Sequence, residues 1–224
     1  MAQPNKAPSS TPVSVIGSHF MVPHQLDIIV DRISSGILLI TDINHKIIFK
    51  VKPCDSFIHE RRVLLDVDDQ PIVTMRDKSV TVHHGWYVFR GDSRSKSDMI
   101  FTTKKRHMIQ LLKSDVNVFL ANKTCSKNVC DFKVKGSWSK RNCTIYMGDT
   151  STTIAQMSKL QSSDNIVKFV NDKFKVSISP NVDIAFVIII IAIVEAMENS
   201  DTNNKSAVQV LGGVSKVVAP ILLA

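Results

Sequence analysis

The chain has 224 residues and a formal net charge of +8 at pH 7, with 44% hydrophobic and 6% aromatic residues. That length suits one sizeable domain with a real core, and the positive charge suggests an acidic partner such as anionic lipid, nucleic acid or an acidic protein surface. The low aromatic content argues against a surface that stacks nucleic-acid bases.

The N-terminal stretch, residues 1–23, contains four prolines and many small polar residues, so we expect a flexible arm. No apolar stretch follows Lys6, and Ala2 stands where a myristoylation signal needs glycine. We therefore expect neither a secretory signal nor this lipid anchor. The expected location is intracellular, either cytoplasmic, peripheral at a membrane or nuclear, with reduced cysteines. These are Cys54, Cys125, Cys130 and Cys143.

From residue 24 onward, short apolar or alternating runs follow one another and are separated by turn-forming clusters such as Asp42–Asn44 and Asp68–Gln70. This pattern is typical of an antiparallel sandwich or barrel with hairpin connections. The predicted strands are Leu26–Val30, Ile37–Thr41, Lys46–Val51, Val63–Val67, Ile72–Met75, Val80–His83, Trp86–Arg90, Met99–Thr103, Met108–Leu112, Val116–Leu120, Phe132–Lys135, Cys143–Met147, Ile154–Met157, Ile166–Val170 and Lys173–Ile178.

Ile184–Val194 is an unbroken run of eleven apolar residues, which a membrane anchor, a buried strand or a core helix would each explain. A membrane span needs about 20 apolar residues. Asp183–Met197 is long for a strand, although eight of the eleven residues are Ile or Val. Length therefore favours a core helix at residues 182–197 and no membrane span. Asn181 is a possible N-cap, with Asp183 in the first turn.

A helix that is apolar on every face has to be surrounded on every face. A sheet closed into a barrel can surround it, and closure also removes the exposed edges of the sheet. We predict a mainly β domain over residues 24–198, a closed antiparallel barrel of about twelve strands around the C-terminal helix. Residues 199–224 are predicted to be a polar linker and a tail. In the tail, Ala207 and Leu211 begin a marginal amphipathic pattern that Gly212-Gly213 interrupts.

Four segments of the chain resemble the plant LURP-one-related family, and the resemblance runs from about Pro23 to Met197. Members of this family are similar to the tubby C-terminal domain and the phospholipid scramblases, which implies a twelve-stranded barrel around a central C-terminal helix. The resemblance also implies a link to plant defence but no established biochemical activity. The four segments are Asp66–Arg76 (DVDDQPIVTMR), Val80–Ser93 (VTVHHGWYVFRGDS), Cys130–Met147 (CDFKVKGSWSKRNCTIYM) and Pro180–Glu195 (PNVDIAFVIIIIAIVE).

The sequence contains no nucleophile motif, phosphate-binding loop, dinucleotide fingerprint or zincin motif, so we predict a non-enzymatic protein without catalytic, cofactor or metal residues. His83 and His84 would point to opposite faces of a strand. The cysteines lack the paired spacing of a zinc site and are interpreted as core residues. Scramblases carry an acidic segment before their terminal helix, but Ser162–Asp172 is poor in the oxygen ligands that calcium needs. We therefore do not expect calcium-dependent scrambling.

Basic clusters on or beside the predicted strands are the candidate site for an anion or a lipid headgroup. Tubby domains bind phosphoinositide headgroups through cationic side chains on the barrel surface, so the resemblance implies a similar role without matching individual residues. The alternative is that these cations are solvated strand faces and protective edge lysines. The candidates are Lys104, Lys105, Arg106, Lys133, Lys135, Lys140 and Arg141.

The leading hypothesis is a tubby-like binding module of plant defence or stress signalling that binds anionic phospholipid headgroups. One alternative is a nucleic-acid-associated transcriptional regulator of the membrane-tethered tubby-like type, although no helix-turn-helix, zinc finger or basic zipper is present. A second alternative is scramblase-like lipid transfer. We expect a monomer, and the sequence identifies no protein partner.

Overall fold

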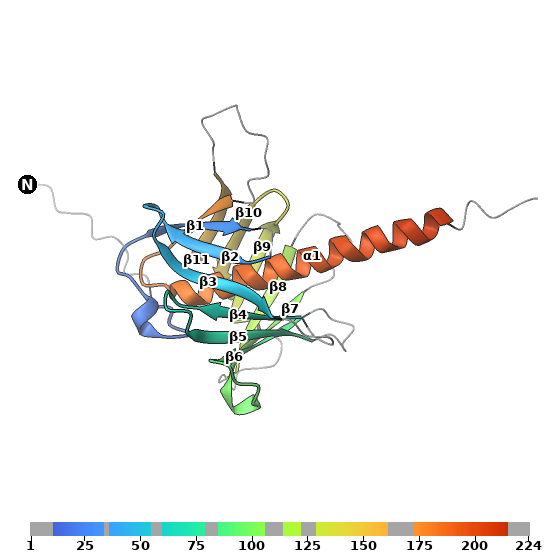
Figure 1. The fold of residues 1–224 in the computed structure, drawn as a ribbon. Coiled ribbons are helices and arrows are strands. Elements are labelled where there is room, and N and C mark those ends of the chain that lie inside the picture. The colour runs from blue at the N-terminus through green and yellow to red at the C-terminus, as the bar shows by residue number, and fades with distance from the viewer. Residues whose placement is uncertain are drawn as a thin grey trace, which may run out of the picture.

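Twelve antiparallel strands close into a barrel around a single C-terminal helix, α1 (Figure 1). The computed structural model describes residues 11–33, 36–54, 60–78, 85–105, 114–121, 129–160 and 173–214, the last fourteen of these by their backbone course alone. Each strand pairs with the next along the chain, and β1 pairs with β12 to complete the ring. The predicted fold class, a mainly β closed antiparallel barrel around a core helix, is confirmed.

The strands fall where the apolar and alternating runs predicted them, with ends that differ by a few residues. Three further predicted strands, Val80–His83, Met108–Leu112 and Ile166–Val170, lie outside the described residues. The strands are β1 (Leu26–Arg32), β2 (Leu38–Asp42), β3 (Ile47–Cys54), β4 (Arg61–Leu65), β5 (Pro71–Asp77), β6 (Trp86–Arg90), β7 (Met99–Lys105), β8 (Ser114–Leu120), β9 (Phe132–Ser137), β10 (Asn142–Met147), β11 (Thr153–Lys159) and β12 (Lys173–Ile178).

Helix α1 (Ile184–Val214) fills the barrel with its first four turns. Every side chain from Ile184 to Met197 is at most 7% exposed, which confirms the core helix and rules out the membrane anchor and the buried strand. Alternate strand residues such as Val73, Met75 and Val88 point inward onto it and are fully buried. No helix in the described part of the chain is both long and apolar enough to cross a bilayer.

The N-terminal segment is not the flexible arm that its prolines predicted, at least from residue 11 onward. It crosses the end of the barrel where α1 begins, with a short 3₁₀ helix at Ser18–Phe20. The amide of Val13 donates to the carbonyl of Asn181 (2.9 Å), and the amide of Asp183 donates back to Val13 (2.9 Å). Val13 and Ile16 are buried in the main core. These two apolar side chains give the segment enough burial to be ordered despite its composition.

Asp183 is the residue that joins this segment to the helix. Its carboxylate is fully buried, and Oδ1 accepts the amide of Phe186 (3.1 Å), which makes Asp183 the N-cap. Oδ2 accepts three consecutive amides, those of Val15 (3.1 Å), Ile16 (2.7 Å) and Gly17 (3.0 Å). The predicted N-cap, Asn181, instead has a left-handed backbone (φ 59°) and lies in the turn before the helix. We call this the closed end of the barrel.

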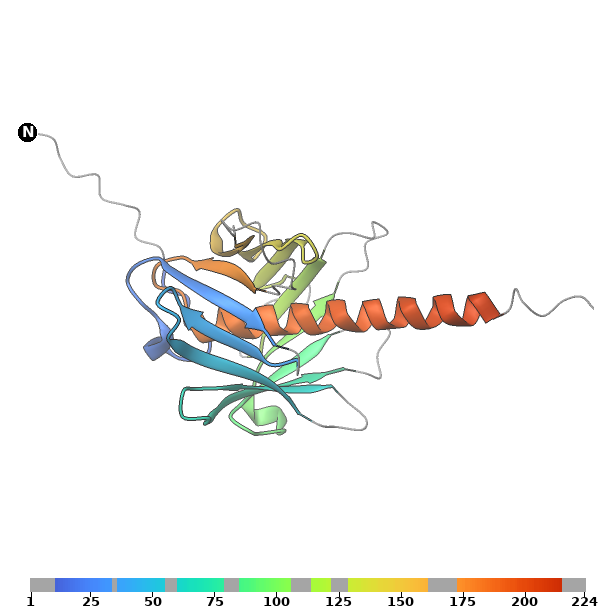
Figure 2. The ribbon, with the colours of Figure 1, turned by 45° about the horizontal axis from the view of Figure 1, so that its top comes forward.

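The opposite end, where α1 leaves the barrel, is the helix-exit end (Figure 2). The helix does not stop at residue 197 as predicted but runs on to Val214, so the predicted polar linker from residue 199 is helical at its start. Extending a helix that is already nucleated adds one hydrogen bond per residue, whereas starting one is unfavourable. The buried turns of α1 supply that nucleus, and residues 201–214 project beyond the strands.

Candidate anion-binding site

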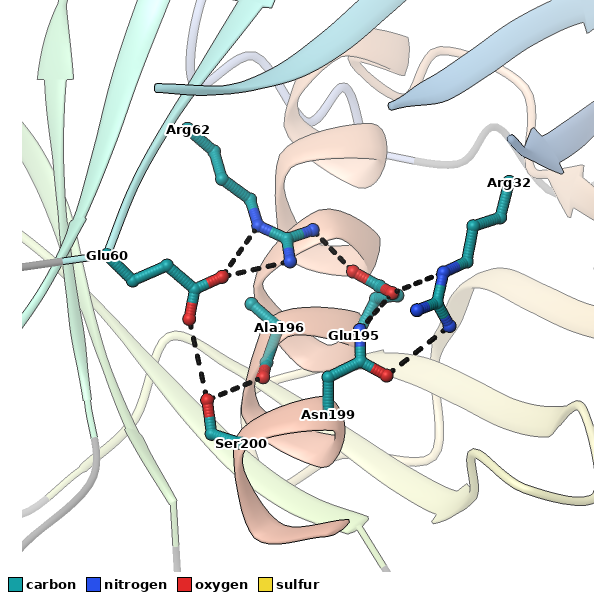
Figure 3. A network of polar contacts seen from close by, with 7 residues as sticks. All are labelled: Arg32, Glu60, Arg62, Glu195, Ala196, Asn199 and Ser200. Atoms are coloured by element: carbon teal, nitrogen blue, oxygen red, sulfur yellow. Dashed lines mark hydrogen bonds and ion pairs between the residues drawn. The ribbon is translucent and has the colours of Figure 1, made fainter. Parts of the chain in front are cut away.

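Two arginines of the strands meet a carboxylate of α1 at the helix-exit end (Figure 3). Glu195 is 2% exposed and lies between two arginines, Arg62 and Arg32. Its Oε2 forms an ion pair with Nη1 of Arg62, and its Oε1 lies 3.3 Å from Nε of Arg32. Arg62 also pairs with Glu60 (2.9 Å), whose second oxygen lies 3.4 Å from the hydroxyl of Ser200.

Each buried charge in this network has a partner of opposite sign, so the network fixes the helix in the barrel and leaves no charge over for a ligand. Lys105, a predicted headgroup ligand, belongs to the same arrangement because its Nζ lies 3.1 Å from Oε1 of Glu198. Both carboxylates at the end of the apolar run are thus held by cations of the barrel rim. The sequence predicted neither pairing, because the partners are far apart along the chain.

Removing one member of the pair at the centre of this network should destabilise the protein strongly. We expect Arg62→Met to lower the free energy of unfolding by about 3–5 kcal/mol, because it leaves the Glu195 carboxylate buried with weaker compensation. Urea unfolding followed by circular dichroism measures the loss. The double variant Arg62→Met/Glu195→Met removes both charges and should be more stable than the single variant. A double variant that is less stable would contradict this account.

Among the predicted candidates that the structure describes, Lys104 alone lies in a cluster of cations on the outer wall of the barrel. It is exposed at the end of β7 and faces outward, because its neighbours Thr103 and Lys105 face the interior. Lys78 lies close by, just after β5. Burial and then the nearby charge of Lys104 lower the pKa of Lys78. Two positive charges are therefore held near each other on the same wall.

Arg76 and Tyr87 complete this cluster. Arg76 of β5 lies directly opposite Tyr87 of β6, on the outer face of the sheet. Nζ of Lys78 lies 4.3 Å from the centre of the Tyr87 ring, a cation–π contact. Among the described residues, no carboxylate forms an ion pair with Arg76 or Lys104. We call Arg76, Lys78, Tyr87 and Lys104 the β5–β7 cluster.

Gly85 makes this arrangement possible. A Cβ at this position would lie 2.4 Å from the carbonyl oxygen of Thr103 and 3.2 Å from Cδ of Lys78. Any side chain here would therefore clash with the backbone of β7 and with the stem of Lys78. The absence of a side chain lets the stem of Lys78 lie flat against the wall and its ammonium reach the Tyr87 ring.

The remaining predicted cations that the structure describes do not gather with Lys104. Lys133 is 8% exposed and forms an ion pair with Asp149, whose hydrogen bond raises the pKa of Lys133. Lys135 lies opposite Asp115 of β8. Lys140 is exposed in the β9–β10 turn. Arg106 lies outside the described residues.

Arg141 packs against aromatic rings and does not extend into solvent. Its guanidinium carbon lies 4.8 Å from the ring centre of Trp138 and 4.7 Å from that of Phe174. Its backbone is left-handed (φ 50°), which closes the turn between β9 and β10. This geometry indicates a structural role for Arg141 at the rim.

The interior offers no room for a ligand and no reactive thiol within the described part of the chain. A cavity between α1 and strands β9–β12, lined by Trp138, Cys143 and Ile190 among others, measures about 10 Å³, the space of one water molecule. Burial raises the pKa of Cys143 to about 12 and also raises that of Cys130, so both stay protonated core thiols. No group of His, Cys, Asp and Glu among the described residues could hold a metal ion.

The sequence could have pointed to Arg76 and Lys78, because the two cations are spaced two residues apart after the apolar Val73 and Met75 in the run VTMRDK. What it could not supply is the strand register that brings them beside Tyr87 and Lys104. That register depends on the pairing of β5 with β6 and of β6 with β7. The outward-facing wall of β5–β7 is therefore the candidate site that the described residues support best.

Comparison with known proteins places the whole barrel in one family. The model of the LURP-one-related family matches residues 30–195. Protein LURP-one-related 10 of Arabidopsis thaliana is 35% identical over 196 residues, covering 86% of this chain and 100% of that protein. Protein LURP1 of the same plant is 36% identical and covers 90% of this chain and 98% of its own length.

A solved structure shares the fold. An X-ray structure of a protein from Arabidopsis thaliana superposes with a TM-score of 0.65 at 32% sequence identity, covering 83% of this chain and 98% of that chain. The family match begins within β1 and spans the other eleven strands, most of the buried part of α1 and the β5–β7 cluster. The chain therefore belongs to the LURP-one-related family.

Proposed function

We propose that the protein is a non-enzymatic binding module that holds the anionic headgroup of a phosphoinositide at the β5–β7 cluster. The observation that carries the proposal is the convergence of Lys78 and Lys104 on one wall: the amide of Lys78 donates to the carbonyl of Gly85, which lies against the backbone of Thr103, the neighbour of Lys104. Burial and then the charge of Lys104 lower the pKa of Lys78. Like charges held together on a partly desolvated wall are stabilised when an anion lies between them. Arg76 adds a guanidinium, whose fork of donors matches a phosphate, and Tyr87 adds a hydroxyl.

Family membership and the net charge of +8 support the proposal. A role in plant defence or stress signalling, which the resemblance implied, is extended to this chain on family membership alone. The described part of the cluster offers cations and one tyrosine ring on a strand wall, and we take a lipid headgroup as its ligand in preference to a specific nucleic-acid site. Scramblase-like transfer has no support from the described residues.

The test is co-sedimentation with vesicles of neutral lipid, with and without a phosphoinositide, at low and at moderate salt. We expect binding only to the anionic vesicles, weakening as salt rises. Arg76→Gln/Lys104→Gln should weaken it by about 2 kcal/mol, or roughly thirtyfold, because each cation at an anionic surface contributes about 1 kcal/mol. Lys105 is left intact because its ion pair with Glu198 supports the fold.

Lys46→Gln/Lys96→Gln is the matched control, since both lysines are exposed in turns at the closed end. It removes the same charge away from the cluster and should leave affinity unchanged. A wild-type protein that binds no anionic vesicle at low salt would rule the proposal out. So would a folded double variant with unchanged affinity. If every polyanion displaced the protein from the vesicles as well as a soluble phosphoinositide headgroup does, the binding would be non-specific and driven by counterion release.

A further inference from the structure

Two arginines lie directly opposite each other on the wall that carries the β5–β7 cluster. Arg61 of β4 pairs in register with Arg76 of β5, and Arg76 pairs in turn with Tyr87 of β6 (Figure 1). Arg62 faces the interior, where it binds Glu195, so its neighbour Arg61 faces outward. Like charges directly opposite each other on one face destabilise a sheet. An anion on this part of the wall therefore stabilises it.

The protein itself supplies one carboxylate here, that of Asp92 in the turn after β6. Its Oδ1 forms an ion pair with Nη2 of Arg61, and the side chains of Arg61 and Asp92 are 20% and 70% exposed. The amide of Gly91 donates to the carbonyl of Ile72 (2.8 Å), which fixes this turn beside β5. Ile72 precedes Arg76 by four residues. Asp92 therefore draws the guanidinium of Arg61 along the wall toward the closed end.

The ion pair is weak and leaves Arg61 incompletely bonded. A pair with an exposed partner contributes little net stability, because water screens it and the side chains lose freedom. Nε of Arg61 is buried and has no hydrogen-bond partner among the described residues. A phosphate group carries more charge than a carboxylate and matches the fork of donors of a guanidinium. Asp92 thus occupies a position from which a phosphate can displace it.

The other carboxylates near this wall are engaged elsewhere. Asp69 pairs with two lysines of β3, and Glu60 pairs with the inward-facing arginine of β4. Asp77 lies opposite a buried tryptophan of β6, so it faces the interior. Asp98 accepts the hydroxyl of a serine in its own turn (2.6 Å). Within the described part of the chain, Asp92 is therefore the one carboxylate that contacts the two opposed arginines.

We propose that Arg61 and Arg76 form a second anion subsite beside the headgroup site, and that Asp92 occupies it in the unliganded protein. The subsite rests on the proposed function and extends it to a ligand class, a headgroup whose ring carries two phosphate groups. Along an extended strand, Arg76 and Lys78 lie about 7 Å apart, a spacing that suits two phosphates on one small ring. One phosphate lies between Lys78 and Lys104. The other brings the two guanidinium groups together in place of Asp92.

Arg61→Gln separates the second subsite from the first. The probes are phosphatidylcholine vesicles that contain a phosphoinositide with either one or two ring phosphates, at equal total charge. The wild type should bind the bisphosphate vesicles more tightly. Arg61→Gln should weaken this binding about fivefold, the contribution of one cation at an anionic surface, and leave binding to the monophosphate vesicles unchanged. Arg76→Gln/Lys104→Gln, in contrast, should weaken both.

Asp92→Asn tests the internal competitor. The change keeps the size of the side chain and removes its charge, so Arg61 becomes available to the ligand. Binding to bisphosphate vesicles should tighten about two- to fivefold, because the exposed ion pair that competes in the wild type is worth little. This gain should vanish when Arg61→Gln/Asp92→Asn is compared with Arg61→Gln. Asp68→Asn, which removes an exposed carboxylate from the β4–β5 turn, is the matched control and should change nothing.

Thermal unfolding followed by circular dichroism shows whether each variant is folded, and Asp92→Asn keeps the subsite testable if Arg61→Gln does not fold. Equal losses on both kinds of vesicle in Arg61→Gln would reduce Arg61 to a distant charge and overturn the subsite. A gain in Asp92→Asn that persists without Arg61 would show general repulsion by Asp92, and would count equally against it.

Failure of the subsite can be told apart from failure of the proposed function. If the wild type binds no anionic vesicle, the headgroup site and the subsite are both wrong. If it binds both kinds equally and only Arg76→Gln/Lys104→Gln weakens binding, the headgroup site stands and the second subsite is wrong. Soluble inositol trisphosphate identifies the source of the ligand. Tight binding of it that depends on Arg61 would support a free phosphate, whereas Arg61-dependent binding confined to vesicles would support a lipid headgroup.

Discussion

Replacing Ile189 by Asp should leave no folded protein. Ile189 lies at the middle of the buried part of α1 and is fully buried, with apolar strand residues around it. A carboxylate there has no partner and no water, so it costs several kcal/mol against a total stability of roughly 5–15 kcal/mol. We expect an aggregated product, measured as the soluble fraction and as the loss of a cooperative thermal transition.

Ile189→Val is the matched control, because it removes one methylene group and keeps the site apolar. It should fold with a loss of about 0.5–1.5 kcal/mol. Deleting residues 183–224 should also prevent folding, since the inner face of every strand would lose its packing partner. A monodisperse deletion variant with a sharp thermal transition would contradict the role of α1 as the core.

Asp183→Ala should be the most damaging change at the closed end. It leaves four amides without their acceptor, three of them in the N-terminal segment and one at the start of α1. Losing an N-cap costs about 1 kcal/mol, and each buried amide left unsatisfied costs about 1–3 kcal/mol. We expect a loss of about 4 kcal/mol in the free energy of unfolding, less where water enters and satisfies the amides.

Native-state proteolysis gives the specific signature of this contact. Cleavage in residues 11–23 should become faster in Asp183→Ala even under conditions in which the barrel stays folded. Asp68→Ala, an exposed carboxylate in the β4–β5 turn, should change stability by no more than about 0.5 kcal/mol. If Asp183→Ala and Asp68→Ala have the same unfolding midpoint and the same proteolysis rate, the N-terminal segment is not held by this carboxylate.

The barrel and its core helix could be predicted because their signals are local. The eleven-residue apolar run is too short for a membrane and too long for a strand, and the strand runs repeat with turn residues between them. The defined structure of the N-terminal segment could not be predicted, because this structure depends on a contact between residues 15–17 and the distant Asp183. The proline-rich composition suggested disorder, yet the segment contains two apolar residues, Val13 and Ile16, that are buried in the main core. They are buried because the segment packs against the start of the distant helix.

The candidate site was predicted only in part, for a related reason. Lys104, Lys105 and Lys133 look alike in the sequence, and their different roles depend on which carboxylate lies within reach. Glu198 pairs with Lys105 and Asp149 with Lys133, while Lys104 lies beside another cation. Charge by itself marks candidates, and strand register decides which of them stay available.

The closure of the ring between β1 and β12 bears on how the chain acquires its structure. The barrel is completed by joining its first strand to its last, and its core arrives only with the helix after that last strand. Partners so distant along the chain give a high contact order, which slows folding. During synthesis the inner faces of the strands stay without their packing partner until α1 has been made, and exposed apolar strands aggregate readily. We therefore expect slow refolding and a marked dependence on chaperones, the consequence of placing the core at the end of the chain.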